Sequence, residues 1–110
     1  MTDLIKEKIR LDDFDVAEYM DNPESQAFFL SDALETGNRD YILSTLNALA
    51  RAQGMTDMAK KVGMKRQSLY AALGPRGNPT LDNLLAIIRA LGLKLKAEED
   101  AAAGDEAKAA

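Results

Sequence analysis

The chain has no cysteine and no histidine among its 110 residues. The first absence excludes a disulfide framework and a thiolate site, and the second removes the usual zinc ligand and the usual general base. The remaining residues do not gather a nucleophile, a base and an oxyanion donor in any recognisable pattern. We therefore expect no enzyme and assign no catalytic residue, metal or cofactor.

Aromatic residues and long apolar runs are also scarce. Aromatic side chains make up 5% of the chain and tryptophan is absent, whereas apolar residues make up 46%. This composition predicts one modest core of helices packed through Leu, Ile, Ala and Met. No window approaches the roughly 20 apolar residues that span a bilayer, and residues 1–16 lack the apolar run of a signal peptide. We expect a soluble, cytoplasmic protein.

The net charge of -4 is unevenly distributed along the chain. Residues 1–40 carry 11 acidic and 4 basic side chains, residues 41–96 carry 2 acidic and 9 basic, and residues 97–110 carry 5 acidic and 1 basic. Such a split is typical of a DNA-facing module attached to an acidic region directed at another partner. Solvated helix faces that happen to differ in sign would explain the same counts.

Turn and cap residues divide the chain into helices. Pro23 suits the first turn of a helix over residues 24–35, and a further helix is expected over residues 39–53. The expected N-caps are Asp15, Asn38, Thr56 and Thr80, and the expected helix stops are Gly37, Gly54 and Gly63. Asp15 would cap a short helix over residues 16–20.

The last helix is expected to follow a loop over residues 74–79. Its apolar residues recur at helical spacing and predict one buried stripe, formed by Leu81, Leu84, Leu85, Ile88 and Leu91. Beyond Gly92, residues 93–96 alternate apolar and basic side chains, as in a half-buried strand. A strand this short needs a partner, either residues 8–11 or its own copy across a two-fold axis.

These elements predict an all-α fold, a small helical bundle with a short C-terminal strand at a dimer interface. Residues 1–37 would form an acidic N-terminal helical region packed on the core. Residues 38–96 would form the core that binds DNA, and residues 97–110 an acidic, alanine-rich disordered tail.

Residues 55–73 have the spacing of a Cro/repressor-like helix-turn-helix. Ala59, four residues before Gly63, would let two helices cross closely, and Gly63 can adopt the left-handed conformation that ends the first helix. Leu69 would then point back into the angle between the helices. The remaining apolar positions of the pair are Met58, Val62, Met64 and Ala72. In DNA-binding proteins of this type, the second helix enters the major groove.

The second helix of this pair carries side chains suited to base edges. Arg66 can pair in bidentate fashion with guanine, and Gln67 with adenine. The residues expected at base edges are Arg66, Gln67, Ser68 and Ala71, and those expected at phosphates are Lys60, Lys61, Lys65, Tyr70, Arg76, Asn78 and Thr80. Ordinary roles compete with these assignments: a solvated helical hairpin, a plain loop around Arg76, and packing at the core edge, which we favour for Tyr70.

Aromatic and large apolar side chains gather in the acidic N-terminal region. They are Phe14, Tyr19, Phe28, Phe29, Leu30 and Leu34. We expect most of them to be core or dimer contacts. An acidic pair of helices that carries aromatic side chains would also suit a basic protein partner.

Three segments of the chain resemble a known family. They are FDVAEYM at residues 14–20, ALETGNRDYILSTLNALARAQGMTDMAKKVGMKRQSLYAAL at 33–73 and GNPTLDNLLAIIRALGLKL at 77–95. Together they resemble the addiction-module antidote proteins, a branch of the Xre/Cro-type helix-turn-helix regulators found in bacterial toxin-antitoxin operons. The recognition-helix positions of that family fall on Lys65, Arg66, Gln67, Ser68 and Ala71.

The resemblance implies an antitoxin of a type II module that neutralises a RelE/ParE-like toxin. It also implies a homodimer, or a complex with the toxin, that binds operator DNA and represses its own operon. The alternative is a helix-turn-helix transcriptional regulator without a toxin partner. The chain departs from the Cro-type pattern at two places. Fewer residues separate Gly54 from Ala59 than in Cro-type relatives, so the first helix of the pair should start late. Lys65 occupies the position where many relatives have a capping Ser or Thr.

Overall fold

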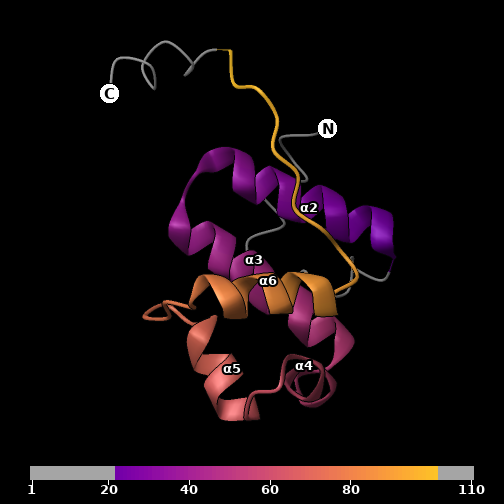
Figure 1. The fold of residues 1–110 in the computed structure, drawn as a ribbon, viewed down its shortest axis with the longest axis vertical. Coiled ribbons are helices and arrows are strands. Elements are labelled where there is room, and N and C mark those ends of the chain that lie inside the picture. The colour runs from indigo at the N-terminus through magenta and orange to yellow at the C-terminus, as the bar shows by residue number, and fades with distance from the viewer. Residues whose placement is uncertain (1–21, 102–110) are drawn as a thin grey trace, which may run out of the picture.

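The computed structural model describes residues 22–101 of the chain, and this part is entirely helical apart from its connections (Figure 1). Its helices are α2 (Pro23–Thr36), α3 (Arg39–Gln53), α4 (Met55–Val62), α5 (Arg66–Ala72) and α6 (Leu81–Ala90). The expected all-α bundle is therefore confirmed for the described residues. The helix expected over residues 16–20 and the strand partner at residues 8–11 lie outside them.

Side-chain caps begin three of the helices. Asn22 accepts a hydrogen bond from the Ser25 amide at 2.8 Å, and Asn38 accepts one from the Tyr41 amide at 3.0 Å. Thr80 accepts from the Asn83 amide at 3.1 Å. Each bond satisfies an amide that the first turn of a helix leaves without a partner. The predicted caps at Asn38 and Thr80 are confirmed.

The junction between α3 and α4 is tighter than expected. Gly54, with φ 101°, ends α3 by donating its amide to Ala50 and Arg51, and it also precedes the first residue of α4. The expectation that Thr56 caps α4 is wrong, because Thr56 lies inside the first turn and α4 has no side-chain cap. The expected late start is also wrong, since α4 begins directly after Gly54.

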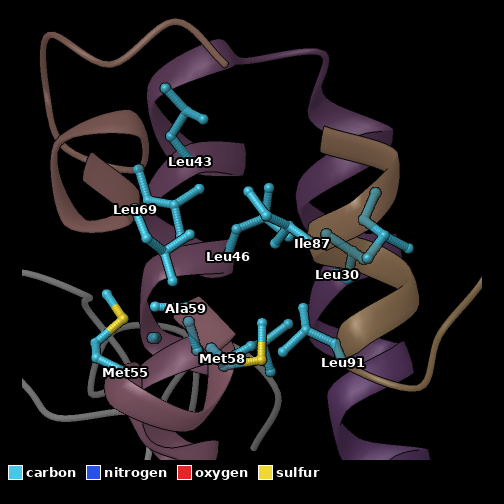
Figure 2. Close-up of a cluster of buried hydrophobic side chains, with 14 residues drawn as sticks. Leu30, Leu43, Leu46, Met55, Met58, Ala59, Leu69, Ile87 and Leu91 are labelled. Atoms are coloured by element: carbon cyan, nitrogen blue, oxygen red, sulfur yellow. The ribbon is translucent and has the colours of Figure 1, made fainter. Parts of the chain in front are cut away.

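The core lies around α3 (Figure 2). Leu46 occupies its centre, with Leu69 of α5 on one side and Ile87 of α6 on the other. Leu30 of α2, beside Ile87, and Met58 of α4 complete the cluster. Burying a large aliphatic side chain stabilises a fold by about 1.5–3 kcal/mol, so this cluster holds all five helices together.

Helix α6 buries its predicted apolar stripe only in part. Ile87, Ile88 and Leu91 are buried, whereas Leu81 is 68% exposed and Leu85 is 40% exposed. The prediction of one continuous buried stripe is therefore wrong at these two leucines. They lie four residues apart and so share a solvent-facing side of α6.

Residues 92–101 leave α6 as an extended segment that runs past α2 (Figure 1). The Leu93 amide bonds to the Ile88 carbonyl at 3.1 Å, which fixes the start of the segment. The predicted strand at residues 93–96 is not formed with any described residue. Its pairing with residues 8–11 lies outside the described residues, and its pairing with a second copy stays a prediction.

Two polar contacts tie α3 to its neighbours. The Tyr41 hydroxyl donates to Asp32 of α2 at 3.0 Å, and Gln53 donates to the Leu91 carbonyl at 3.1 Å. Burial, together with the hydrogen bond and the negative charge of Asp32, raises the pKa of Tyr41. The phenol therefore stays protonated and remains a donor at neutral pH.

The loop between α5 and α6 packs against the end of α5 at Gly77. Gly77 is buried, and its amide donates to the Gly74 carbonyl at 2.9 Å. A Cβ atom at this position would overlap the carbonyl group of Ala72 and lie 2.7 Å from the Ala71 carbonyl oxygen. Only glycine lets the loop backbone approach the helix this closely.

We predict that Gly77→Ala lowers the free energy of unfolding by about 3 kcal/mol, because the loop must move off α5 to make room for the methyl group. Urea denaturation followed by circular dichroism measures the change. Gly74→Ala is the matched control, since a Cβ there meets its nearest atom at an ordinary 3.4 Å. Equal stabilities of the two variants would contradict the steric assignment.

Candidate functional site

Helices α4 and α5 form a compact hairpin around Gly63. Gly63 has φ 80°, and its amide and that of Met64 both donate to the Ala59 carbonyl at 2.9 Å. Ala59 and Leu69 are buried, while Val62 and Met64 are half-buried against the core. The predicted local roles of the alanine, the glycine and the leucine are confirmed. The small Ala59 side chain and the left-handed glycine let two short helices pack closely.

The hairpin turns one side of α5 to solvent. Leu69 and Leu73 are buried and fix the helix to the core, whereas the four positions predicted at base edges, Arg66, Gln67, Ser68 and Ala71, are exposed. Arg66, Gln67 and Ser68 occupy the first turn of the helix. No side chain caps α5, because Lys65 stands at the cap position. The polar groups of the first turn are therefore directed to solvent.

The positions predicted at phosphates lie near the two ends of α5. Lys60 and Lys61 lie in the last turn of α4, Lys65 in the turn, and Arg76, Asn78 and Thr80 in the loop before α6; all are exposed. Thr80 already accepts a hydrogen bond as the cap of α6. Gly77, packed on α5, ties this loop to the helix that carries Arg66.

Tyr70 does not pack at the core edge as expected. The side chain is 54% exposed. It borders a hollow of about 320 Å³ between α3 and the end of α5, together with Asn47, Arg51 and Pro75. Its hydroxyl is thus available to a ligand beside the loop.

Opposite charges gather at the two ends of the described structure. Residues 55–80 carry five basic side chains and one acidic side chain, Asp57, and α4 and α5 form the lower end in Figure 1. Helix α2 lies above α6 in the same view and carries Glu24, Asp32 and Glu35 without a basic residue. Within the described residues, none of the basic side chains of residues 55–80 forms an ion pair, so their charge is open to a ligand.

A second hollow was not anticipated from the sequence. It measures about 430 Å³ and lies between α2 and residues 92–98. Leu34 and Leu95 line its two walls and stay partly exposed. The alternation of leucine and lysine at residues 93–96 marked this segment as one that needs a partner, but helical periodicity could not place it beside α2.

The described residues contain neither a metal-binding cluster nor a membrane-spanning helix. Residues 22–101 contain no group of three or more acidic side chains placed to hold a metal ion. None of the described helices is long and apolar enough to cross a membrane.

The chain matches the sequence profile of one family, described as "Probable addiction module antidote protein", over residues 10–99. It is also 37% identical over 90 residues to an uncharacterized protein of Haemophilus influenzae, an alignment that covers 82% of this chain and 93% of that protein. No solved structure matches the chain. An antidote neutralises a toxin, so the family gives the chain an antitoxin role and implies a toxin as its partner. The chain belongs to the family of addiction module antidote proteins.

Proposed function

We propose that this antidote binds operator DNA through α5 and represses its own operon. The observation that carries the proposal is the first turn of α5, where Arg66, Gln67 and Ser68 face solvent while Leu69 anchors the helix in the core. In this proposal α4 and α5 act as an Xre-type helix-turn-helix whose second helix enters the major groove. The protein is a cytoplasmic binding protein and not an enzyme.

In this proposal some of the exposed side chains contact DNA bases and the others contact DNA phosphates. Arg66 pairs with guanine and Gln67 with adenine, which supplies sequence preference. Lys60, Lys61 and Lys65 meet phosphates and set the register of the hairpin on the duplex. At the α6 end, Arg76, Asn78 and Tyr70 contact phosphate, and Thr80 contributes less because Asp82 in the same turn repels the anion.

The double variant Arg66→Ala, Gln67→Ala should bind operator DNA at least tenfold more weakly, since one good bidentate pair is worth about 1–3 kcal/mol. It should also lose its preference for the operator over DNA of unrelated sequence. Lys65→Ala should weaken binding to all sequences alike and lower the salt slope by about 1. Gel shift with DNA from upstream of the operon, at several salt concentrations, measures both. Lys96→Ala, on the extended segment beside α2, is the control. Unchanged preference in the double variant would refute the assignment of α5.

For the toxin we propose a small basic protein of RelE/ParE-like fold encoded beside the antidote gene. The acidic surface of α2 supports a basic partner, and family membership favours this role over a regulator without a toxin.

Co-expression with the neighbouring gene should relieve the growth arrest that the neighbour causes alone, and the two proteins should purify as one complex. The same neighbour with an empty vector is the control. Persistent arrest despite soluble antidote, with no complex recovered, would exclude this toxin.

We further propose that two copies associate through the exposed leucines of α6. Leu81 and Leu85 lie on one side of the helix that follows the loop carrying Arg76. A two-fold axis at this side would place two α5 helices on one palindromic operator. The alternative contact is the paired segment 93–96 expected from the sequence.

The double variant Leu81→Lys, Leu85→Lys should convert the dimer to a monomer in light scattering at several concentrations, because apolar contact is replaced by like charge. Leu95→Lys is the matched control and should remain dimeric. If Leu95→Lys is monomeric and the α6 variant remains dimeric, the dimer contact lies at residues 93–96. A wild-type chain that is monomeric both free and on DNA would rule out the dimer.

A further inference from the structure

The hollow between α2 and residues 92–98, here called the α2 groove, has one helical wall and one extended wall. Ala27, Ser31 and Leu34 recur along α2 at the spacing of a single helix face. Ala27 and Ser31 are small, so they leave the hollow of about 430 Å³ above buried Leu30. The groove is therefore a depression with an apolar floor.

Large apolar side chains remain in contact with water at this groove. Leu34 on the helical wall is 40% exposed, and Leu95 on the extended wall is 43% exposed. Phe28, on the neighbouring side of α2, is 64% exposed and stacks edge-on against Phe29 at 5.7 Å between ring centres. A concave surface with exposed leucines on both walls is typical of a site for a protein partner.

The extended wall also has an open backbone. Leu93 is the last residue of the segment whose amide bonds back to α6. Within the described residues, the backbone groups of residues 94–98 form no hydrogen bond. An extended segment with free N–H and C=O groups can pair with the main chain of an incoming peptide.

The charge around the groove selects the partner. Glu24 and Glu35 lie on α2. The extended wall carries Lys94 and Lys96, followed by Glu98 and Glu99 at its end. Asp32 adds a further carboxylate, which also accepts the bond from Tyr41. The groove lining itself carries Lys94, Lys96 and Glu98, so the negative side of the groove is α2, which has acidic side chains and no basic one. A second copy of this chain would bring like charges together, whereas a basic segment would be attracted.

We propose that the α2 groove is the binding site for a basic segment of the toxin. One apolar side chain of that segment fills the hollow between Leu34 and Leu95, and flanking Lys or Arg side chains meet Glu35 and Glu98. The inference rests on the proposed basic toxin. The groove lies at the end of the molecule opposite α5, so toxin and operator DNA can bind the same chain together (Figure 1).

The test uses the full-length chain and the purified product of the neighbouring gene in titration calorimetry. Leu34→Lys and Leu95→Lys should each weaken binding at least tenfold, because each removes an apolar contact and repels a basic segment. Thr56→Lys, which adds the same charge at an exposed position of α4, should bind as the wild type does. Glu35→Gln with Glu98→Gln should flatten the dependence of affinity on salt. Operator affinity in gel shift should not fall in any groove variant.

Each contrary result has its own meaning. Wild-type chain that does not bind the neighbouring protein overturns the toxin assignment and the groove proposal with it. Wild-type binding that survives both groove variants overturns the groove proposal alone. In that case, loss of dimer mass in the groove variants assigns the groove to a second copy. A lower free energy of unfolding in urea, with toxin affinity kept, assigns it to residues 1–21 of the same chain.

Discussion

Burial of α3 is the interaction on which the rest of the structure depends. Leu46 and Leu49 are fully buried, and every other described helix contributes a side chain to the cluster around them. Helices α4 and α5 are 8 and 7 residues long. Isolated helices shorter than about 12 residues are marginal in water, so these two exist only because Met58 and Leu69 are held in this core. The orientation of Arg66 is consequently a property of the core rather than of α5.

Glycine positions convert this packing into a defined surface. Gly63 lets α5 fold back on α4, and Gly77 lets the loop lie on the end of α5. Glycine is needed at position 63 because the backbone there is left-handed. It is needed at position 77 because a side chain would not fit. Lys65 before α5 and Arg76 after it both remain exposed.

Helix ends could be predicted from the sequence because a cap is a local hydrogen bond, as at Asn38 and Thr80. The inner and outer sides of α5 were also predictable, since Ala59, Gly63 and Leu69 define the angle between two adjacent helices. The buried face of α6 was not predictable, because its broad apolar stripe leaves open which edge meets the core. Leu85 was expected to be buried, but Ile87 is buried in its stead. The α2 groove joins segments about 60 residues apart, which no periodicity relates.

The arrangement of charge resolves an apparent conflict between an acidic protein and the proposed DNA face. Helix α2 and the hairpin of α4 and α5 lie on opposite sides of α6 in Figure 1. Salt screens exposed charges from one another beyond a Debye length, which is about 10 Å at 0.1 M, so the charge near each surface matters more than the total. The net charge of -4 is then a poor measure of the potential at either end. Under the proposed function, each partner therefore meets the local charge of its own surface.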